Sequence, residues 1–523
     1  MKAFAALLDH LIYQPSRNGK LRLLADYFAT TPDPDRGYGL AALTGTLDIP
    51  HAKPAMLRDL IMARVDPALF AYSYDYVGDL AETIALMWPS ASENVEPAPR
   101  LGEIVAKLKA TPKAAIPAVI AGWLDGLDAT ARWALLKVLT GGLRIGVSAR
   151  LAKTALAQWG NLDIADIEEL WHGHAPPYTE IFAWAEKRGP KPAAMAANTF
   201  RPFMLSHAIE DHEFAALEPA EFVAEWKWDG IRVQVAGSIL GQARLFARSG
   251  DDISHTFPDV VGAARFDAVL DGELLVRGTG TNPASFGDLQ QRLNRKTVTR
   301  KMLESYPAFV RVYDILFVEG EDLRALPWTE RRKRLEAFMA NVPPQFDLSP
   351  VVDFKTWDEL TTIRASSRGA GMEGLMLKRR DAAYTGGRPK GPWFKWKRDP
   401  LTVDAVLMYA QRGHGKRSSF YSDYTFGVWS ADDLVPIGKA YFGFTDAELK
   451  QIDSWVRNNT TERFGPVRAV APGLVLEVAF DAAQKSSRHK SGIALRFPRV
   501  SRIRWDKPAA EADNLENVAK LVE

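Results

Sequence analysis

The hydrophobic positions along the chain follow three patterns, and each pattern covers a continuous stretch. In the first, up to about residue 190, apolar residues recur at helical spacing, as in "ARWALLKVLTGGLRIGVSARLAKTALAQWG". One apolar stripe in this segment consists of Leu135, Leu136, Leu139 and Leu143. The pair Gly141 and Gly142 is typical of a helix end. This stretch is therefore predicted to be all α, and the Pro- and Ala-rich segment Glu186 to Pro202 that follows is predicted to be a linker.

In the second pattern, which extends to about residue 400, short alternating runs predominate. "RVQVAG", "DAVLDGELLV", "FVRVYDILFV" and "GLMLKR" have the period of half-buried strands, and a few helical stretches interrupt them. This mixture predicts an α+β region built on antiparallel sheet. One of the helical stretches is "WTERRKRLEAFMANV", whose basic cluster Arg331 to Arg334 is expected to be a solvated helix face.

The third pattern begins at "RDPLTVDAVLMYAQRG", where β-like runs are separated by turns. "YTFGVWS", "LVPIGKAYFGF" and "PGLVLEVAFDA" have the spacing expected of a small β-barrel. "QRGHGKRSS" is expected to be a mobile basic loop, in which His414 is incidental rather than a ligand.

Composition narrows the class of protein. A chain of 523 residues is too long for one core, and 47% hydrophobic with 25% charged residues is ordinary for a soluble globular protein. The absence of cysteine excludes disulfides, thiolate zinc sites and a cysteine nucleophile, and it fits a reducing cytosol. Charged residues interrupt the N-terminal segment, so it lacks the apolar core of a signal peptide, and no stretch approaches the ~20 apolar residues that span a bilayer.

The distribution of charge says more than its sum. The net charge of +2 is too small to indicate a nucleic-acid partner by itself. The segment from Lys485 to Lys507, however, holds eight Lys or Arg residues against one acid, Asp506. It either faces something anionic or is a solvated basic surface.

Lys227 is the first candidate for chemistry. It lies between Trp226 and Trp228 in "EWKWDGIRVQV", just before an Asp-Gly turn. A lysine is a nucleophile only as the free amine, and desolvation by indoles or nearby cations lowers the pKa of a lysine. The alternative is a strand lysine whose head reaches water along apolar neighbours.

Two cations and two carboxylates are further candidates. Lys395 and Lys397 in "PWFKWKRDP" point to one face of a strand, where two ammoniums are tolerated if they share a phosphate; alternatively they guard an exposed strand edge. Glu273 in "LDGELLV" and Glu373 in "GMEGLMLKRR" lie in β-like runs. Either is a candidate Mg²⁺ ligand or a surface strand residue.

In order, the chain contains "EWKWDGIR", "FARSGDD", "DGELL", "YDILF", "EGLMLK" and "WFKWK". This series resembles the nucleotidyltransferase motifs of the covalent ligase and mRNA-capping superfamily, and the whole chain resembles a bacterial, three-domain ATP-dependent DNA ligase. "LRIGVSARLAKTALAQ" is similar to the family's DNA-binding domain, and "LRFPRVSRIRWDK" is similar to its OB-fold domain and terminal motif. The resemblance implies a helical DNA-binding domain (1–198), an α+β antiparallel nucleotidyltransferase domain (199–399) and an all-β OB-fold barrel (400–523).

The resemblance also implies an activity. Lys227 attacks the α-phosphate of ATP and becomes a lysyl-AMP, the adenylate passes to the 5′-phosphate of a nick, and the 3′-hydroxyl then seals the strand. An RNA ligase, a capping guanylyltransferase and a non-catalytic DNA-binding scaffold are the alternatives. The helical N-terminal third argues against the first two, and the complete set of motifs argues against the third.

The match to the family's motifs also implies a role for individual residues. Glu225 would help to recognise the adenine edge, Arg232 and Arg248 would hold ribose or phosphate oxygens, and Tyr313 would stack on the purine. Mg²⁺ (or Mn²⁺) would be bound by Glu273 and Glu373. Arg388 would be the family's ATP-binding arginine upstream of the last motif, and Lys395 and Lys397 would neutralise the α-phosphate. Arg504, Asp506 and Lys507 would orient the pyrophosphate, and for that step the OB-fold domain would swing in and out again, with the segment from Lys397 to Leu401 as its hinge.

DNA binding would involve all three domains and mostly phosphate and sugar contacts. Arg144, beside the glycines of "GGLRIG", is the expected phosphate contact in the first domain; the alternative is a buried arginine with a structural partner. The resemblance further implies a monomer that encircles nicked duplex DNA in the cytoplasm, associated with the nucleoid.

Overall fold

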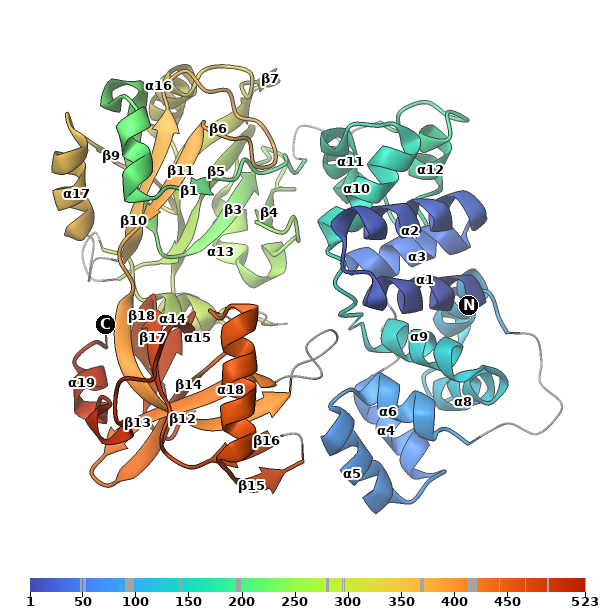
Figure 1. Cartoon of the computed structure of the whole chain (residues 1–523). Helices are drawn as coiled ribbons and strands as arrows, with labels where there is room; N and C mark the ends of the chain where they lie inside the picture. The colour runs from blue at the N-terminus through green and yellow to red at the C-terminus, as the bar shows by residue number, and fades with distance from the viewer. Residues whose placement is uncertain are drawn as a thin grey trace. The chain divides into compact units, whose positions relative to one another are not determined.

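A computed structural model of the chain describes residues 1–47, 49, 53–89, 98–141, 143–193, 199–278, 282–293, 295, 297–366, 371–412, 421–441, 443–465, 467–486 and 489–522. The basic loop around His414 lies outside these residues, as do residues 194–198 of the expected linker. The chain forms two compact units. One consists essentially of the N-terminal helices, and the other consists of the sheets that follow them (Figure 1).

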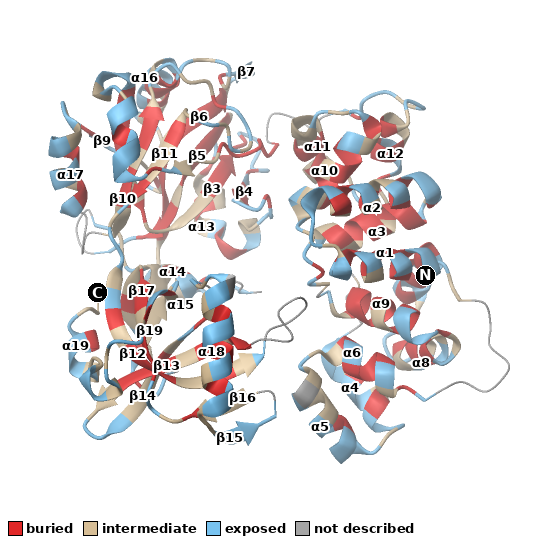
Figure 2. Cartoon of the chain, viewed as in Figure 1, coloured by how far each residue is buried: buried red, intermediate tan, exposed pale blue. Residues whose placement is uncertain are grey.

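The helical unit contains α1 (Lys2–Tyr13), α2 (Arg17–Thr30), α3 (Asp35–Thr44), α4 (Pro54–Met62), α5 (Pro67–Val77), α6 (Leu80–Met87), α7 (Leu101–Ala110), α8 (Ile116–Gly126), α9 (Ala129–Thr140), α10 (Ala149–Gly160), α11 (Ile164–Leu170) and α12 (Thr179–Ala185). The inward faces of these helices share one apolar core, which is visible as the buried stripes in Figure 2. Leu135, Leu136 and Leu139 of the expected stripe are buried in α9. Leu143 is not on this helix, because Gly141 ends α9 with a positive φ of 68°.

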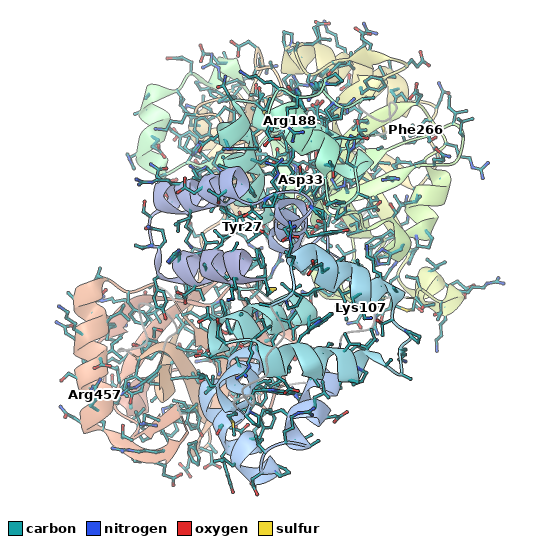
Figure 3. The ribbon with its side chains drawn as sticks, turned by 90° about the vertical axis from the view of Figure 1, so that its right-hand side faces the viewer. Tyr27, Asp33, Lys107, Arg188, Phe266 and Arg457 are labelled. Carbon is teal, nitrogen blue, oxygen red and sulfur yellow. The ribbon has the colours of Figure 1, made fainter. Side chains whose placement is uncertain are left out.

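Ion pairs cross this unit between segments far apart in the sequence. Arg36 on α3 donates to Glu186 and to Asp33, at 2.7 Å and 2.8 Å, and its side chain is only 5% exposed. Arg188 contacts the same two acids; Asp33 and Arg188 are labelled in Figure 3. The network ties the end of the last helix to the start of the third.

The second unit begins with two mainly antiparallel sheets, as the alternating runs predicted. One has the strand order β1 (His207–Ala208), β11 (Trp393–Lys397), β10 (Met372–Arg379), β2 (Phe222–Trp228), β9 (Val351–Val352), with β1 parallel to β11. The other has the order β4 (Arg244–Ala247), β3 (Ile231–Ala236), β5 (Ala268–Val276), β6 (Ala308–Val318), β7 (Glu321–Asp322), with β8 (Phe346–Leu348) parallel to β6. The helices of this region are α13 (Pro258–Ala263), α14 (Phe286–Gln290), α15 (Arg300–Ser305), α16 (Trp328–Met339) and α17 (Trp357–Ala365).

The basic cluster on α16 corrects one expectation. Arg331 is fully buried and forms a two-pronged ion pair with Asp314 of β6, at 2.8 Å and 2.9 Å, and Arg332 is also buried. The guanidinium of Arg331 additionally donates to two backbone carbonyl oxygens. Only part of the cluster is solvated, because Asp314 supplies a buried partner that local spacing does not reveal.

The C-terminal part of the second unit is a curled, mainly antiparallel sheet. Its strands are β12 (Leu401–Arg412), β13 (Tyr421–Ser430), β14 (Asp433–Ala440), β15 (Thr460–Phe464), β16 (Val467–Val470), β17 (Val475–Phe480) and β20 (Arg499–Arg504). The hairpin β18 (Ala482–Lys485)–β19 (Ile493–Arg496), α18 (Asp446–Asn458) and α19 (Leu515–Ala519) complete it. An OB-fold-like barrel is consistent with this arrangement. None of the described helices is both long and apolar enough to cross a membrane.

Candidate active site

Both central sheets contribute to a cavity of about 410 Å³. Its wall includes nine of the residues singled out in the sequence, namely Glu225, Lys227, Arg232, Arg248, Glu273, Tyr313, Glu373, Lys395 and Lys397. A cavity of this size with a few convergent polar groups is typical of a ligand-binding site. Trp226 and Trp228 line the same cavity on either side of Lys227.

Strand register brings these residues together. Lys227 on β2 lies opposite Gly374 on β10, and the pairing slips between Met372 and Gly374, which places Glu373 beside the lysine. Gly374 has a φ of 136°, and a Cβ there would lie 2.3 Å from the carbonyl oxygen of Trp396. Only glycine fits this position, so the residue after Glu373 is fixed by the sheet itself.

The Asp-Gly pair after Lys227 has an equally local reason. A Cβ on Gly230 would lie 2.5 Å from the carbonyl oxygen of Leu274 and 2.8 Å from the side chain of Glu273. The glycine therefore lets the turn after β2 approach β5 closely, and this brings Glu273 to the cavity wall.

Lys227 and the two glutamates form the centre of the site. The ammonium of Lys227 donates a hydrogen bond to Glu373, and 23% of the lysine side chain is exposed. Burial raises the pKa of Glu273 to about 8, although Lys227 and Arg232 oppose the shift. Burial would also raise the pKa of Glu373, but the charges of Lys227, Lys397 and Arg496 outweigh it and lower that pKa.

The two glutamates fit a hard divalent cation. Among the described residues no group of three or more metal-binding side chains occurs, so a site made wholly of protein ligands is not indicated. Mg²⁺, however, commonly takes one or two carboxylates and completes its shell with water and substrate phosphates. Glu273 and Glu373, half-buried on the cavity wall, meet that requirement.

Glu225 lies deeper, where burial raises its pKa despite the opposing charges of Lys378 and Arg332. One carboxylate oxygen is 2.6 Å from the Nζ atom of Lys378. The other oxygen is 3.6 Å from Arg332 and accepts no hydrogen bond from any described residue. A buried acceptor without a donor is costly, so this oxygen is suited to a donor on a bound ligand.

Lys378 also contacts two rings of the wall. Its ammonium lies 4.6 Å from the ring centre of Tyr313 and 4.6 Å from that of Trp393. Lys378 is the last residue of the motif "EGLMLK", and the motif predicts no role for it. Its ion pair with the buried Glu225 is diagonal across the two strands, since Lys378 lies opposite Val223, and the motif spacing does not give this register.

Arg232 is held firmly in the wall. Its guanidinium forms two hydrogen bonds with Asp271, at 2.7 Å and 3.1 Å, and a third with the carbonyl oxygen of Met204 at 2.7 Å. The hydroxyl of Tyr384 donates to Asp271 at 2.6 Å. Arg232 thus presents a fixed positive charge whose hydrogen-bonding groups largely face the protein.

The phosphate-binding candidates form a cluster of cations. Desolvation lowers the pKa of Lys395, and the charges of Arg388, Lys397 and Lys227 add to the effect. Desolvation is also the main cause that lowers the pKa of Arg248, and repulsion from Arg232 and Arg388 adds to it. Arg388 is exposed and is not among the lining residues, yet its charge reaches both groups. Mutual repulsion of this kind is relieved when an anion binds.

The C-terminal part of the second unit contributes different residues to the cavity than the sequence predicted. Arg496 and Phe497 line it; Arg496 pairs with Asp229 and lies 3.3 Å from Glu373. Lys397 pairs with Asp481 at 2.9 Å. Arg504, Asp506 and Lys507 are all described, and none of them lines the cavity. Arg504 and Lys507 pair with Asp404.

The positive charge of the segment from Lys485 to Lys507, the basic tail, is therefore balanced by more acids than its sequence suggested. Of its cations, Arg496 and Arg499 pair with Asp229 and Asp481, which lie outside the tail. Arg504 and Lys507 share Asp404, also outside it. The acids come from other strands, so a count along the sequence misses them.

Arg144 belongs to the other unit, in the loop between α9 and α10. It is exposed and has a positive φ of 45°, so it is not the buried structural arginine considered as its alternative. In the same loop the carbonyl oxygen of Gly146 accepts a hydrogen bond from Lys20 at 2.8 Å.

A lysine beside paired carboxylates and a cation cluster is typical of a covalent nucleotidyltransferase. Comparisons with known proteins give the family. The sequence model described as "ATP dependent DNA ligase domain" matches residues 203–397, and the one described as "ATP dependent DNA ligase C terminal region" matches residues 417–507.

Relatives match over most of the chain. "Probable DNA ligase" of Koribacter versatilis is 35% identical over 416 residues, which cover 74% of this chain and 71% of that protein. "DNA ligase 1" of Korarchaeum cryptofilum is 30% identical over 407 residues, covering 76% and 73%. A solved structure described as "Pmar-Lig_Pre." shares the fold, with a TM-score of 0.60, 18% identity and coverage of 96% of this chain and 99% of that one.

The chain therefore belongs to the family of ATP-dependent DNA ligases. It is an enzyme, and its activity is the ATP-dependent sealing of nicks in DNA. An RNA ligase, a capping enzyme and a non-catalytic scaffold are not favoured.

Proposed function

We propose that Lys227 is the nucleophile of this ligase and that residues 199–399 form its adenylation domain, between a DNA-binding domain (1–198) and an OB-fold domain (400–523). The Nζ atom of Lys227 attacks the α-phosphorus of ATP, an N–P bond forms, and the P–O bond to pyrophosphate breaks. The amine must lose its proton in this step. The observation that carries the assignment is the position of Lys227, in the cavity wall, bonded to Glu373 and facing the cation cluster.

The remaining steps move AMP. The adenylate passes from Lys227 to the 5′-phosphate of the nick, and the 3′-hydroxyl attacks that phosphorus and releases AMP. Lys395, Lys397, Arg248 and Arg388 neutralise phosphate oxygens during these transfers, a role supported by the lowered pKa of Lys395 and Arg248. Arg504, Asp506 and Lys507 orient the pyrophosphate, which requires the C-terminal domain to reposition about residues 397–401.

Other residues bind the adenine base and the metal ion. Glu225 accepts a hydrogen bond from the adenine through its unpartnered oxygen, while Tyr313 stacks on the purine and Arg232 supplies fixed charge near the ribose or phosphates. Glu273 and Glu373 hold Mg²⁺ or Mn²⁺. When bound, such an ion supplies charge neutralisation to the phosphates.

The DNA partner is a nicked duplex, which Arg144 and the basic residues of the C-terminal domain contact through phosphates. We further propose that the enzyme encircles the duplex as a cytoplasmic, nucleoid-associated monomer. Sealing assays on nicked duplex DNA and on the same nick in RNA, followed at several salt concentrations, test this substrate choice.

Labelling tests the nucleophile. Incubated with α-labelled ATP and Mg²⁺, the enzyme should acquire an acid-labile label, and Lys227→Ala should acquire none. Lys333→Ala is the control, because Lys333 is a 72% exposed lysine on α16. A Lys227→Ala protein that still acquires the label would place the nucleophile elsewhere.

A further inference from the structure

Asp404 holds two of the cations assigned to the pyrophosphate. It lies on β12, and one of its carboxylate oxygens accepts hydrogen bonds from Arg504 at 3.1 Å and from Lys507 at 2.7 Å. Asp404 lies about a hundred residues from the two cations in the sequence. Strand pairing brings them together, because β17 pairs with β12 on one side and with β20, which ends at Arg504, on the other.

The Asp404 residue is held in place, but one of its two carboxylate oxygens lacks a hydrogen-bond donor among the described residues. The Asp404 side chain is 14% exposed, and its backbone N–H donates to Asp513 at 2.8 Å. Its second carboxylate oxygen is buried and accepts no hydrogen bond from any residue that the structure describes. Such an orphan acceptor is unfavourable for stability, so a purely structural role does not account for it.

The two cations differ in how they are held. Arg504 also forms three hydrogen bonds with Asp506, at 2.9 Å, 3.0 Å and 3.3 Å, within the same short segment. The only ion-pair partner that the described residues offer Lys507 is Asp404. Without the charge of Asp404, two long side chains would repel each other and regain rotamer freedom.

We propose that Asp404 is a positioning residue for self-adenylation, which keeps Arg504 and Lys507 side by side so that both meet the pyrophosphate. This inference rests on the proposed role of those two cations. Asp404 on β12 and Arg504 on β20 belong to the C-terminal sheet, and Lys507 lies just after β20, so Asp404 accompanies both cations when that sheet repositions. Its effect is confined to the step in which pyrophosphate leaves.

The test separates that step from sealing. In Asp404→Asn, the single-turnover rate of label transfer from α-labelled ATP should fall about 10- to 100-fold, as is usual when an outer-shell partner is lost. Sealing of a nick that already carries AMP on its 5′-phosphate, measured without ATP, should stay within about twofold of the unchanged enzyme. A residue needed only for folding would slow both steps alike.

Glu477→Gln is the matched control. Glu477 lies opposite Asp404 in the β12–β17 ladder, but it accepts a hydrogen bond from Ser501 at 2.6 Å instead of pairing with the two cations. It should slow neither step selectively. The result that overturns the inference is an Asp404→Asn enzyme that behaves like Glu477→Gln, or one that loses both steps equally, while Arg504→Ala and Lys507→Ala still slow self-adenylation. If these two substitutions leave self-adenylation unchanged, the role proposed for the cations is wrong, and the role of Asp404 is overturned with it.

Discussion

Charge is organised differently in the helical unit and around the cavity. In the helical unit, Arg36 is surrounded by the acids that satisfy it, and Lys137 is buried against Asp79. Around the cavity, Lys395 and Arg248 are crowded by other cations, which help desolvation to lower the pKa of each. The charges of Arg36 and Lys137 are neutralised by acids of the protein, whereas the charges of Lys395 and Arg248 are neutralised when an anion binds.

The difference separates structural from functional charges without reference to motifs. A buried ion pair that is lost leaves an uncompensated charge and costs stability. A cation whose neighbours repel it contributes little to stability, so its removal should affect catalysis instead. Substitutions of charged residues in the two regions test this distinction.

Arg36→Ala should give the largest effect, a loss of about 3 kcal/mol in the free energy of unfolding, because Asp33 and Glu186 lose their buried shared partner and are left with the exposed Arg188. Self-adenylation should be unchanged. Urea unfolding of the full chain measures the loss, with hydrogen exchange reporting on α2 and α3. Arg22→Ala, an exposed position on α2, is the control. An unchanged stability would contradict the distinction.

The same network predicts a dependence on pH. The hydrogen bond from Arg36 lowers the pKa of Glu186 to about 2, against burial that would raise it. A carboxyl with a lowered pKa stabilises the fold above its ordinary pKa of about 4.5 and loses that contribution as the pH falls toward 2. Arg36→Ala should therefore show a smaller loss of stability between these pH values than the unchanged protein.

The two regions also differ in how far the sequence predicted them. The cavity residues were found because each lies in a short motif whose order is specific, and nine of them line one cavity. Helical spacing predicted the all-α region and the burial of Leu135 and Leu139. Both inferences depend on local pattern, which a sequence carries directly.

Partners distant in the sequence were not predictable in this way. Arg331 was expected in solvent, and its partner Asp314 lies on another element. Asp404 satisfies Arg504 and Lys507 from about a hundred residues away, so the basic tail looked unpaired. Arg496 and Phe497 at the cavity were missed because they precede the terminal motif, and only the arrangement of strands brings them there.

Lys395→Ala should slow self-adenylation about 100-fold, because one phosphate-neutralising charge is lost from a desolvated site. Its stability should match that of the unchanged protein or exceed it slightly, since the remaining cations repel one another less. Single-turnover labelling and thermal unfolding measure the two effects. Lys390→Ala, at an exposed neighbouring position, is the control. A loss of stability as large as that expected for Arg36→Ala would show that Lys395 has a structural role.

Lys397→Ala should have an intermediate effect, because this lysine both lies in the cation cluster and pairs with an acid of the protein. It lines the cavity, yet Asp481 already neutralises it in part, and 43% of its side chain is exposed. Sealing should fall about tenfold, whereas the affinity for nicked DNA should change less than about twofold. Equal losses of sealing and binding would mean that Lys397 is only a phosphate anchor.

Arg144→Ala should have the smallest effect and compares two cations within the helical unit. Arg144 is exposed and forms no ion pair with a described residue, whereas Arg150, a few positions further on, lies 3.5 Å from Glu168. Loss of one phosphate contact should weaken the binding of nicked duplex by about 1 kcal/mol and reduce the slope of log affinity against log salt by about one. Arg150→Ala should change that slope less, because Glu168 already neutralises the charge. Equal changes in slope would show that pairing within the protein does not decide which arginine meets DNA.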